Sequence, residues 1–211
     1  MSPSKIPDDS LERRLASTEP VPGGGAAVAR TGAYAAALMV KVLRLSLRRC
    51  KDAELAGKLE SWREEADRCV ETFRDLEDDD QGAFSRLLEA LRLRRREPED
   101  PGAAERVRKA SEGASAVPLR MMEESARLLA VLEEIARLAV AGHVRAEADV
   151  GVAADLLLAV VGARWNVNAN LGGVGPGDRH EELCRRRDEL RSRAQADHGR
   201  IVQHLLGILP G

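Results

Sequence analysis

Aromatic residues are scarce in this sequence of 211 residues, where they make up 2% of the chain, and no stretch alternates between polar and apolar residues. Strands favour aromatic and β-branched side chains and commonly show that alternation, so an all-β fold is excluded. Cysteine is also rare: Cys50, Cys69 and Cys184 lie far apart and form no CxxC pair. An odd number of scattered thiols predicts no disulfide framework and favours a reducing compartment.

Neither positive nor negative charge is in large excess. The 33 Lys and Arg residues are balanced by 35 Asp and Glu residues, which gives a net charge of −2. We therefore expect no nucleic-acid partner.

The first ten residues lack the apolar core of a signal peptide, and the long apolar stretch 26–43 is interrupted by Arg30, Thr31 and Lys41. We expect no membrane span and a cytoplasmic location.

What the chain does contain favours helices. It has 44% apolar residues, and its 32 alanines lie mostly in stretches that also carry Leu, Arg and Glu. Apolar residues recur at steps of three and four, which predicts helical segments at about 26–49, 52–93, 103–142, 150–171 and 179–209. Within the third segment, Val117-Pro118 predicts a kink or a break. We expect one all-α, single-domain bundle of long antiparallel helices over residues 11–209, after a flexible N-terminus at residues 1–10.

Two features predict that the chain associates with itself. The segment 150–161 is apolar almost all round, as in a helix at the centre of a bundle or in a subunit interface. Alanine-rich faces such as that of Ala33, Ala36 and Ala37 add more apolar surface than one small bundle can bury. We expect a homodimer or a higher homo-oligomer.

Four local patterns could serve chemistry, and each has a simpler explanation. Gly23–Gly25 precede a helix, so their backbone could bind an anion at free N–H groups, or another helix could cross closely there. The acidic run Glu77–Asp80 could belong to a site, or it could be a solvated helix surface or mark a kink. Asp149 could act in a site or cap a helix. Asn166 and Asn170 share one helical face, where they need polar partners or a ligand unless the helix frays.

A metal site is not predicted. His180 and Cys184 lie four residues apart with no third ligand near them in the sequence. His198 and His204 are six residues apart and point to different faces of a helix. No serine, histidine and aspartate arrangement of a hydrolase is evident either.

The order and spacing of four blocks resemble the cyclodeaminase/cyclohydrolase family, which comprises the C-terminal domain of formiminotransferase-cyclodeaminase and the stand-alone methenyltetrahydrofolate cyclohydrolases. Residues 20–26, PVPGGGA, resemble the PxPGGG opening of that family, and residues 80–84, DQGAF, resemble its DxxAF element. Residues 117–119, VPL, are similar to its VP turn. Residues 148–171 resemble its SD…AA…NVxxNL stretch, so the likeness covers about residues 10–207.

The resemblance implies a cyclodeaminase-like helical fold and an enzyme of one-carbon metabolism. Such enzymes hydrolyse 5,10-methenyltetrahydrofolate or cyclise 5-formiminotetrahydrofolate with loss of ammonia, and are thus hydrolases or lyases. The reduced folate is the substrate, and no separate cofactor is expected. The resemblance also favours a homodimer whose site is lined from both subunits.

The same resemblance assigns roles to individual residues. Asp80 and Asp149 match the two aspartates of the family and are candidates for acid–base catalysis. The segment Gly23, Gly24, Gly25 and Ala26 would cradle the folate or its glutamate carboxylates. Asn166 and Asn170 would hydrogen-bond the pterin or hold the aspartates in place.

Several polar positions depart from the family pattern. Arg44 and His143 each stand where the family has asparagine, Ala148 replaces a serine, and Arg145 introduces a charge. His143 could act as a catalytic base near neutral pH, whereas Arg44 and Arg145 would suit binding of a more anionic substrate. Three functions therefore stay open: folate conversion, turnover of another amidine, formyl or imine compound, or a non-catalytic helical protein that binds folate or a partner.

Overall fold

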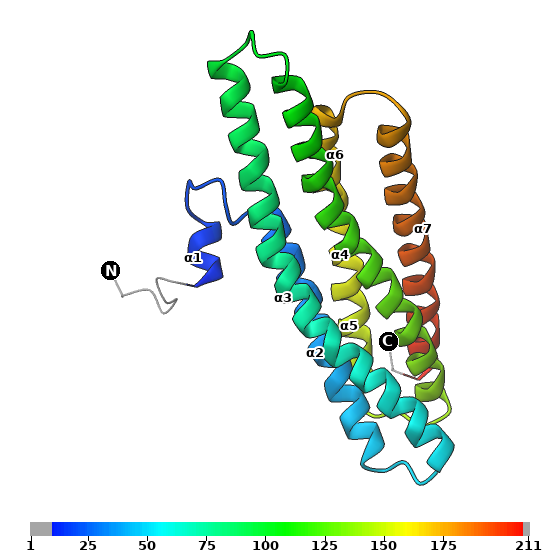
Figure 1. The fold of residues 1–211 in the computed structure, drawn as a ribbon. Helices are drawn as coiled ribbons and strands as arrows, with labels where there is room; N and C mark the ends of the chain where they lie inside the picture. The colour runs from blue at the N-terminus through cyan, green and yellow to red at the C-terminus, as the bar shows by residue number, and fades with distance from the viewer. Residues whose placement is uncertain (1–9, 209–211) are drawn as a thin grey trace.

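The computed structural model describes residues 10–208, which form helices and no strands (Figure 1). The elements are α1 (Leu11–Leu15), α2 (Gly24–Leu47), α3 (Ala53–Arg96), α4 (Ala103–Val140), α5 (Glu147–Val160), a 3₁₀ turn (Val161–Ala163), α6 (Arg164–Val174) and α7 (Asp178–Leu206). The predicted all-α bundle is confirmed. The flexible N-terminus predicted for residues 1–10 falls almost wholly outside the described residues.

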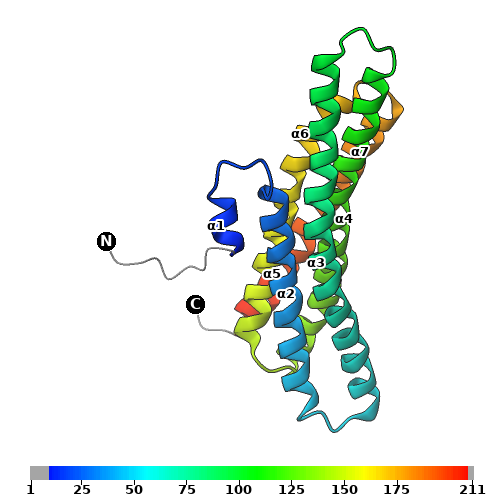
Figure 2. The same ribbon diagram turned by 60° about the vertical axis from the view of Figure 1, so that its left-hand side comes forward.

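The long helices α3 and α4 form an antiparallel pair around which the other helices are arranged (Figures 1 and 2). Helix α2 packs against α3 on one side and against α5 on the other. Helix α4 contacts α3, α5, α6 and α7, so it is the central element of the bundle. The first helix after the N-terminus, α1, buries no residue and lies at the outside. The α3–α4 and α6–α7 connections lie toward one end of the bundle, and α2 begins partway along α3, at the level of Asp80 (Figures 1 and 2).

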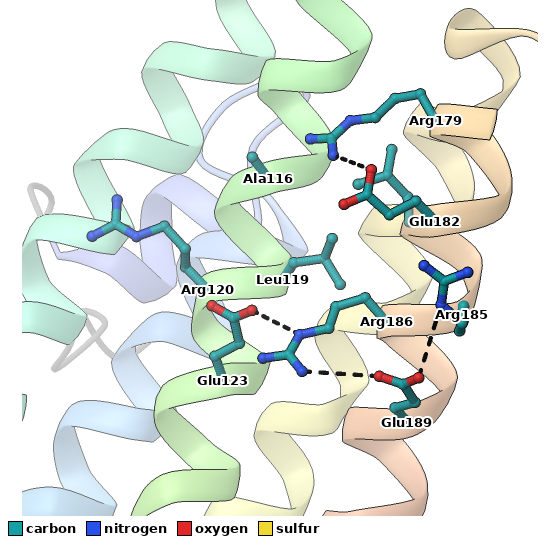
Figure 3. Close-up of a pocket in the computed structure, with 10 residues that line it drawn as sticks. Ala116, Leu119, Arg120, Glu123, Arg179, Glu182, Arg185, Arg186 and Glu189 are labelled. Atoms are coloured by element: carbon teal, nitrogen blue, oxygen red, sulfur yellow. Dashed lines mark hydrogen bonds and ion pairs between the residues drawn. The ribbon is translucent and has the colours of Figure 1, made fainter.

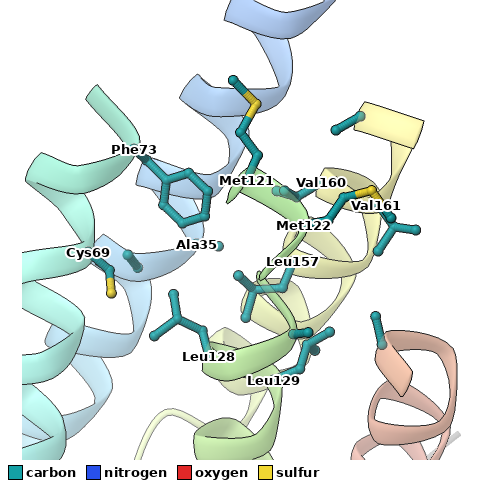
Figure 4. Close-up of a cluster of buried hydrophobic side chains, with 14 of the residues drawn as sticks. Ala35, Cys69, Phe73, Met121, Met122, Leu128, Leu129, Leu157, Val160 and Val161 are labelled. Atoms are coloured by element: carbon teal, nitrogen blue, oxygen red, sulfur yellow. The ribbon is translucent and has the colours of Figure 1, made fainter. Parts of the chain in front are cut away.

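Small and flexible side chains fill the core in place of aromatic rings (Figure 4). Phe73 is the largest fully buried side chain, and its ring occupies the position that a Cβ on Gly32 would need. The glycine thus lets α2 approach α3 closely. Around this crossing the core consists of Ala35, Met39, Leu43, Met121, Met122, Leu128, Leu129, Leu157 and Val160.

One predicted helix is divided in two, and of the kink or break predicted at Pro118 the break is absent. Helix α4 does not break at Pro118 but continues through it. The predicted segment 150–171 is not one helix, because the 3₁₀ turn at Val161–Ala163 separates α5 from α6. Helix α6 also continues past Gly172 and Gly173 to Val174, and Gly175, with φ of 76°, ends it. Elsewhere the predicted helices end within a few residues of the observed ones.

Two segments are long and apolar enough to cross a membrane by length and composition alone, namely 24–47 and 147–174. Both pack into the bundle, where 56% and 44% of their most apolar windows are buried. The prediction of no membrane span is not tested by this observation. The burial of 150–161 is one-sided, because Val152 is 50% exposed within the chain.

Candidate active site

The three glycines form the start of α2 and leave backbone donors free. Gly23 is the N-cap residue, and the first hydrogen bond of the helix runs from the Ala27 N–H to the Gly23 carbonyl. The N–H groups of Gly24, Gly25 and Ala26 therefore have no acceptor within the helix. No side chain caps this end. Partial positive charge accumulates at such a helix start and favours an anionic or strongly polar ligand.

Asp80 lies directly against this helix start. A Cβ added to Gly25 would overlap the Asp80 carboxylate, so glycine at this position leaves room for the carboxylate beside the helix start. Among the described residues the Asp80 side chain has no hydrogen-bond or ion-pair partner. Its partial burial raises the pKa of the carboxyl group to about 6. Near neutral pH such a group can accept a proton and return it, as general acid–base catalysis requires.

An ion pair one turn away fixes Asp80 relative to the glycines. Arg30 of α2 donates two hydrogen bonds to the buried Glu77 of α3, from Nε at 2.8 Å and from Nη2 at 2.9 Å. The hydrogen bond to Glu77 raises the pKa of Arg30 further above its ordinary value. This two-point contact holds the register of α2 and α3 at the site.

Asn170 connects the site to the proline of α4. Its Nδ2 donates to the carbonyl oxygen of Ala114 at 2.7 Å. That carbonyl would normally accept a bond from the N–H of residue 118, which proline lacks. The asparagine thus satisfies the group that Pro118 leaves free, which explains how α4 passes through the proline without breaking.

This arrangement predicts a coupled effect on stability. Asn170→Ala should lower the free energy of unfolding by about 1–3 kcal/mol, because the buried Ala114 carbonyl loses its donor. In a Pro118→Ala background the restored N–H can bond that carbonyl, so the same substitution should cost less. Urea denaturation of the wild type, both single variants and the double variant measures this difference. Equal costs in the two backgrounds would contradict the assignment.

A cavity of about 260 Å³ brings these groups together. Asn166 lies at its edge, with Oδ1 at 3.5 Å from the position of a Cβ on Gly24. Six predicted site residues line the cavity: Gly23, Gly24, Gly25, Asp80, Asn166 and Asn170. Ala26 is fully buried beside it and can contribute only its N–H group. The four lining residues that the sequence analysis did not assign are Pro20, Val21, Phe84 and Ala169, which all belong to the quoted blocks.

The other predicted site residues lie at the opposite end of α2. Asp149 is paired with Lys41, Oδ2 to Nζ at 2.7 Å, and Lys41 is about 26 Å from Gly24 along the helix at 1.5 Å per residue. Asp149 is the third residue of α5 and is not its N-cap, which is Ala146 in the left-handed conformation, so the capping explanation is wrong. Within one chain, Asp149 and Asp80 do not share a cavity.

His143 and Arg145 also lie far from the Asp80 cavity. Both are exposed in the α4–α5 connection and line a separate cavity of about 300 Å³ with Arg49 and Lys51. The Arg145 N–H donates to Ser46 Oγ at 3.2 Å. Arg44 is exposed on α2 and lines neither cavity. The structure of one chain therefore separates these three residues from Asp80.

A third cavity, of about 330 Å³, lies between α4 and α7 (Figure 3). Many charged side chains line it, but they form ion pairs with one another. Glu123 accepts from Arg186 at 3.0 Å, and Glu182 accepts from Arg179 at 2.7 Å. Glu189 lies 3.9 Å from both Arg185 and Arg186. Because its charges satisfy one another, this groove is a weaker candidate site than the Asp80 cavity. Within residues 10–208 no group of three His, Cys, Asp or Glu side chains could hold a metal ion.

The fold and the cavity define a helical-bundle protein in which a partly buried carboxyl group, unpaired among the described residues, lies at a helix start. The family model described as formiminotransferase-cyclodeaminase matches residues 9–189. The chain therefore belongs to the formiminotransferase-cyclodeaminase family.

Three known proteins show how close the likeness is. The methenyltetrahydrofolate cyclohydrolase of Methylorubrum extorquens is 30% identical over 193 residues, which span 90% of each chain. The formimidoyltransferase-cyclodeaminase of Sus scrofa is 29% identical over 195 residues, which span 92% of this chain but 36% of the porcine protein. A crystal structure of formiminotetrahydrofolate cyclodeaminase from Thermotoga maritima shares the fold, with a TM-score of 0.81 at 24% identity over 94% of this chain and 96% of that chain.

Proposed function

We propose that the protein is a folate one-carbon enzyme that hydrolyses 5,10-methenyltetrahydrofolate in the Asp80 cavity. The observation that carries the proposal is the unpartnered Asp80 carboxyl group, with a pKa of about 6, against the free amides of α2. The full-length similarity to the cyclohydrolase of Methylorubrum extorquens supports this substrate class. These relatives do not favour a non-catalytic protein or an unrelated amidine, formyl or imine substrate.

The geometry suits each proton transfer of the hydrolysis. The methenyl carbon sits in a cationic amidinium, which an ionised Asp80 would stabilise. Asp80 accepts a proton from water as the oxygen bonds to that carbon. It then donates the proton to N5 as the carbon–N5 bond breaks, and the hydroxyl proton leaves as the formyl carbonyl forms on N10. One proton is released overall.

The remaining lining groups would bind and orient the pterin part of the substrate. The Phe84 ring is half-buried in the lining and offers an apolar surface for a flat ring. Asn166 supplies a free amide, and Asn170 keeps its carbonyl oxygen for the ligand while Nδ2 is held by Ala114. The amides of Gly24 and Gly25 are available to substrate oxygen or carboxylate groups.

Cyclisation of 5-formiminotetrahydrofolate is the second candidate reaction. The shared fold with the Thermotoga maritima cyclodeaminase favours it. In that reaction N10 attacks the formimino carbon and loses its proton, and the bond from that carbon to the imino nitrogen breaks. Asp80 would pass the N10 proton to the imino nitrogen, which takes a second proton from solvent and leaves as ammonia. Both reactions need one proton carrier beside the same carbon, so the single carboxyl group of the cavity can serve either.

Turnover of both folates by the purified protein tests the proposal. Loss of the methenyl absorbance, beyond the spontaneous rate in a buffer blank, establishes the cyclohydrolase. Appearance of that absorbance from the formimino compound, together with ammonia, establishes the cyclodeaminase. No turnover of either compound at any pH between 5 and 8 would refute the proposed function.

The proposal extends to assembly and location. We propose a homodimer, because large apolar side chains of α2, α5 and α6 remain exposed in the chain: Tyr34 is 55%, Val152 50% and Trp165 63% exposed. Exposed side chains of this kind suit a second copy of the chain. We also propose a cytoplasmic location. We further propose that the protein binds no nucleic acid and no membrane, and that it needs neither a metal ion nor a separate cofactor.

A further inference from the structure

The cavity between the α2–α3 connection and the α4–α5 connection has no role in the proposed function. It has a volume of about 300 Å³ and lies at the end of the bundle opposite the α3–α4 and α6–α7 connections (Figure 1). Ser46, which lines it, is about 33 Å from Gly24 along α2, at 1.5 Å per residue. Within one chain this cavity is therefore separate from the Asp80 cavity.

Positive charge without a partner distinguishes this cavity. Three fixed cations and one histidine line it, namely Arg49, Lys51, Arg145 and His143, and we call it the basic cavity. Among the described residues, none of these four side chains has a hydrogen-bond or ion-pair partner. The arginines of the groove between α4 and α7, by contrast, pair with glutamates. Gathered like charges repel one another, so an anion from outside the chain would stabilise the basic cavity.

The one carboxylate in the lining does not balance these charges. Asp52 caps the start of α3, where its Oδ1 accepts from the N–H groups of Glu54 at 2.9 Å and of Leu55 at 3.1 Å. Three fixed cations and one carboxylate leave a net charge of +2 around the cavity. Protonation of the histidine would raise this charge further.

Stabilisation of helix ends accounts for only two of the four cations. Arg49 follows the end of α2 and His143 follows the end of α4, where positive charge is favourable. Lys51 and Arg145 instead come directly before the N-cap residues of α3 and α5, where positive charge is unfavourable. The starts of α3 and α5 themselves favour an anion. A bound anion would therefore interact favourably with both these helix starts and the cations beside them.

The backbone around the basic cavity is held in place by one buried hydroxyl group. Ser46 Oγ donates to the Val42 carbonyl oxygen at 2.8 Å and accepts from the Arg145 N–H at 3.2 Å. This contact joins the end of α2 to the α4–α5 connection. On the other side of the cavity, Cys50 Sγ donates to the Asp52 carbonyl oxygen at 3.3 Å. The segments that carry the cations are thus positioned before any ligand arrives.

We propose that the basic cavity binds a small phosphate-bearing anion with at least two negative charges. The guanidinium groups of Arg49 and Arg145 each offer two parallel N–H donors to phosphate oxygens, and Lys51 and His143 add further donors. A volume of about 300 Å³ is at the lower limit of ligand sites, which suits a group as small as a diphosphate. The inference goes beyond the proposed function and does not depend on it.

Titration calorimetry of the purified protein with three anions tests the proposal. In phosphate-free buffer of low ionic strength, pyrophosphate should bind once per chain and more tightly than inorganic phosphate or citrate. Arg49→Gln and Arg145→Gln should each lower the affinity for pyrophosphate about 10- to 100-fold, because each removes charge-assisted hydrogen bonds. Arg96→Gln is the matched control and should bind as the wild type does, because Arg96 is exposed at the far end of α3.

Three results would overturn the inference. The first is no binding of pyrophosphate, and the second is an affinity that Arg49→Gln and Arg145→Gln leave unchanged or that Arg96→Gln lowers equally. The third is binding of citrate as tight as that of pyrophosphate, which would exclude selection of the phosphate group. No folate enters this experiment, so its outcome is independent of whether the protein turns folates over.

Thermal unfolding gives a second readout that separates binding from a role in the fold. Pyrophosphate should raise the melting temperature of the wild type and of Arg96→Gln, but not that of Arg145→Gln, because a ligand stabilises only a folded state that binds it. Without ligand, Arg145→Gln should be at least as stable as the wild type, since it removes an unpaired cation from a helix start. A less stable Arg145→Gln variant would show that the arginine serves the fold and would contradict the proposal.

Discussion

Replacing Asp80 with asparagine is expected to lower kcat for the folate substrate by about 100- to 10,000-fold, the range that general acid–base groups contribute. Asparagine has nearly the same shape, so the cavity stays filled, but its amide cannot carry the proton between water and N5. Asp79→Asn is the control, because Asp79 is the neighbouring residue, is exposed and pairs with Arg120 at 3.4 Å. The control should retain the wild-type rate. A fully active Asp80→Asn variant would rule out Asp80 as the proton carrier.

The same variant should be more stable than the wild type at pH 7. Burial raises the pKa of Asp80 from 3.8 to about 6, so the folded state binds this proton more tightly than the unfolded state does. The ionised carboxylate therefore destabilises the fold at neutral pH, and this destabilisation diminishes as the pH falls through about 6 towards 3.8. An uncharged asparagine avoids it. Greater stability together with lost turnover would show that catalysis, and not folding, has been removed.

Gly25→Ala is expected to lower kcat/KM by about 10- to 100-fold. The new Cβ would overlap the Asp80 carboxylate, which must then move away from the helix start. Displacement of a catalytic group by about 1 Å can cost about a hundredfold in rate. The measurement is steady-state turnover, with unfolding followed in parallel.

Gly57→Ala is the matched control for this substitution. Gly57 is exposed within α3, and a Cβ there would meet no atom within 4 Å. Alanine at this position should raise the free energy of unfolding by about 0.8–1 kcal/mol without changing the rate. Equal rates for the two variants would refute the claim that Gly25 makes room for Asp80.

Local patterns in the sequence predicted the helices, whereas the family resemblance, and not the local patterns, singled out the residues that line the Asp80 cavity. Helical spacing of apolar residues located the bundle, and the glycine, aspartate and asparagine blocks lie together as expected. Phe84 was not assigned, although it lies four residues after Asp80 and so on the same side of α3. That spacing was the signal that could have identified it.

What the sequence did not predict depends on tertiary contacts. The continuity of α4 at Pro118 requires the Asn170 side chain from another helix, which spacing along α4 cannot indicate. The separation of Asp149 from Asp80 follows from the antiparallel register of α2 and α5. A family resemblance gives the order of the blocks along the chain, whereas the distance between them depends on how the helices pack.

The pH dependence of kcat/KM tests most directly that Asp80 carries the proton in this cavity. With spontaneous hydrolysis subtracted, the rate of the wild type should rise with pH through about 6, as Asp80 ionises, and level off above it. Asp79→Asn should give the same curve. Asp80→Asn should give a low rate without this rise. A rise near pH 6 that persists in Asp80→Asn would contradict the account, because another group would then be the one that titrates.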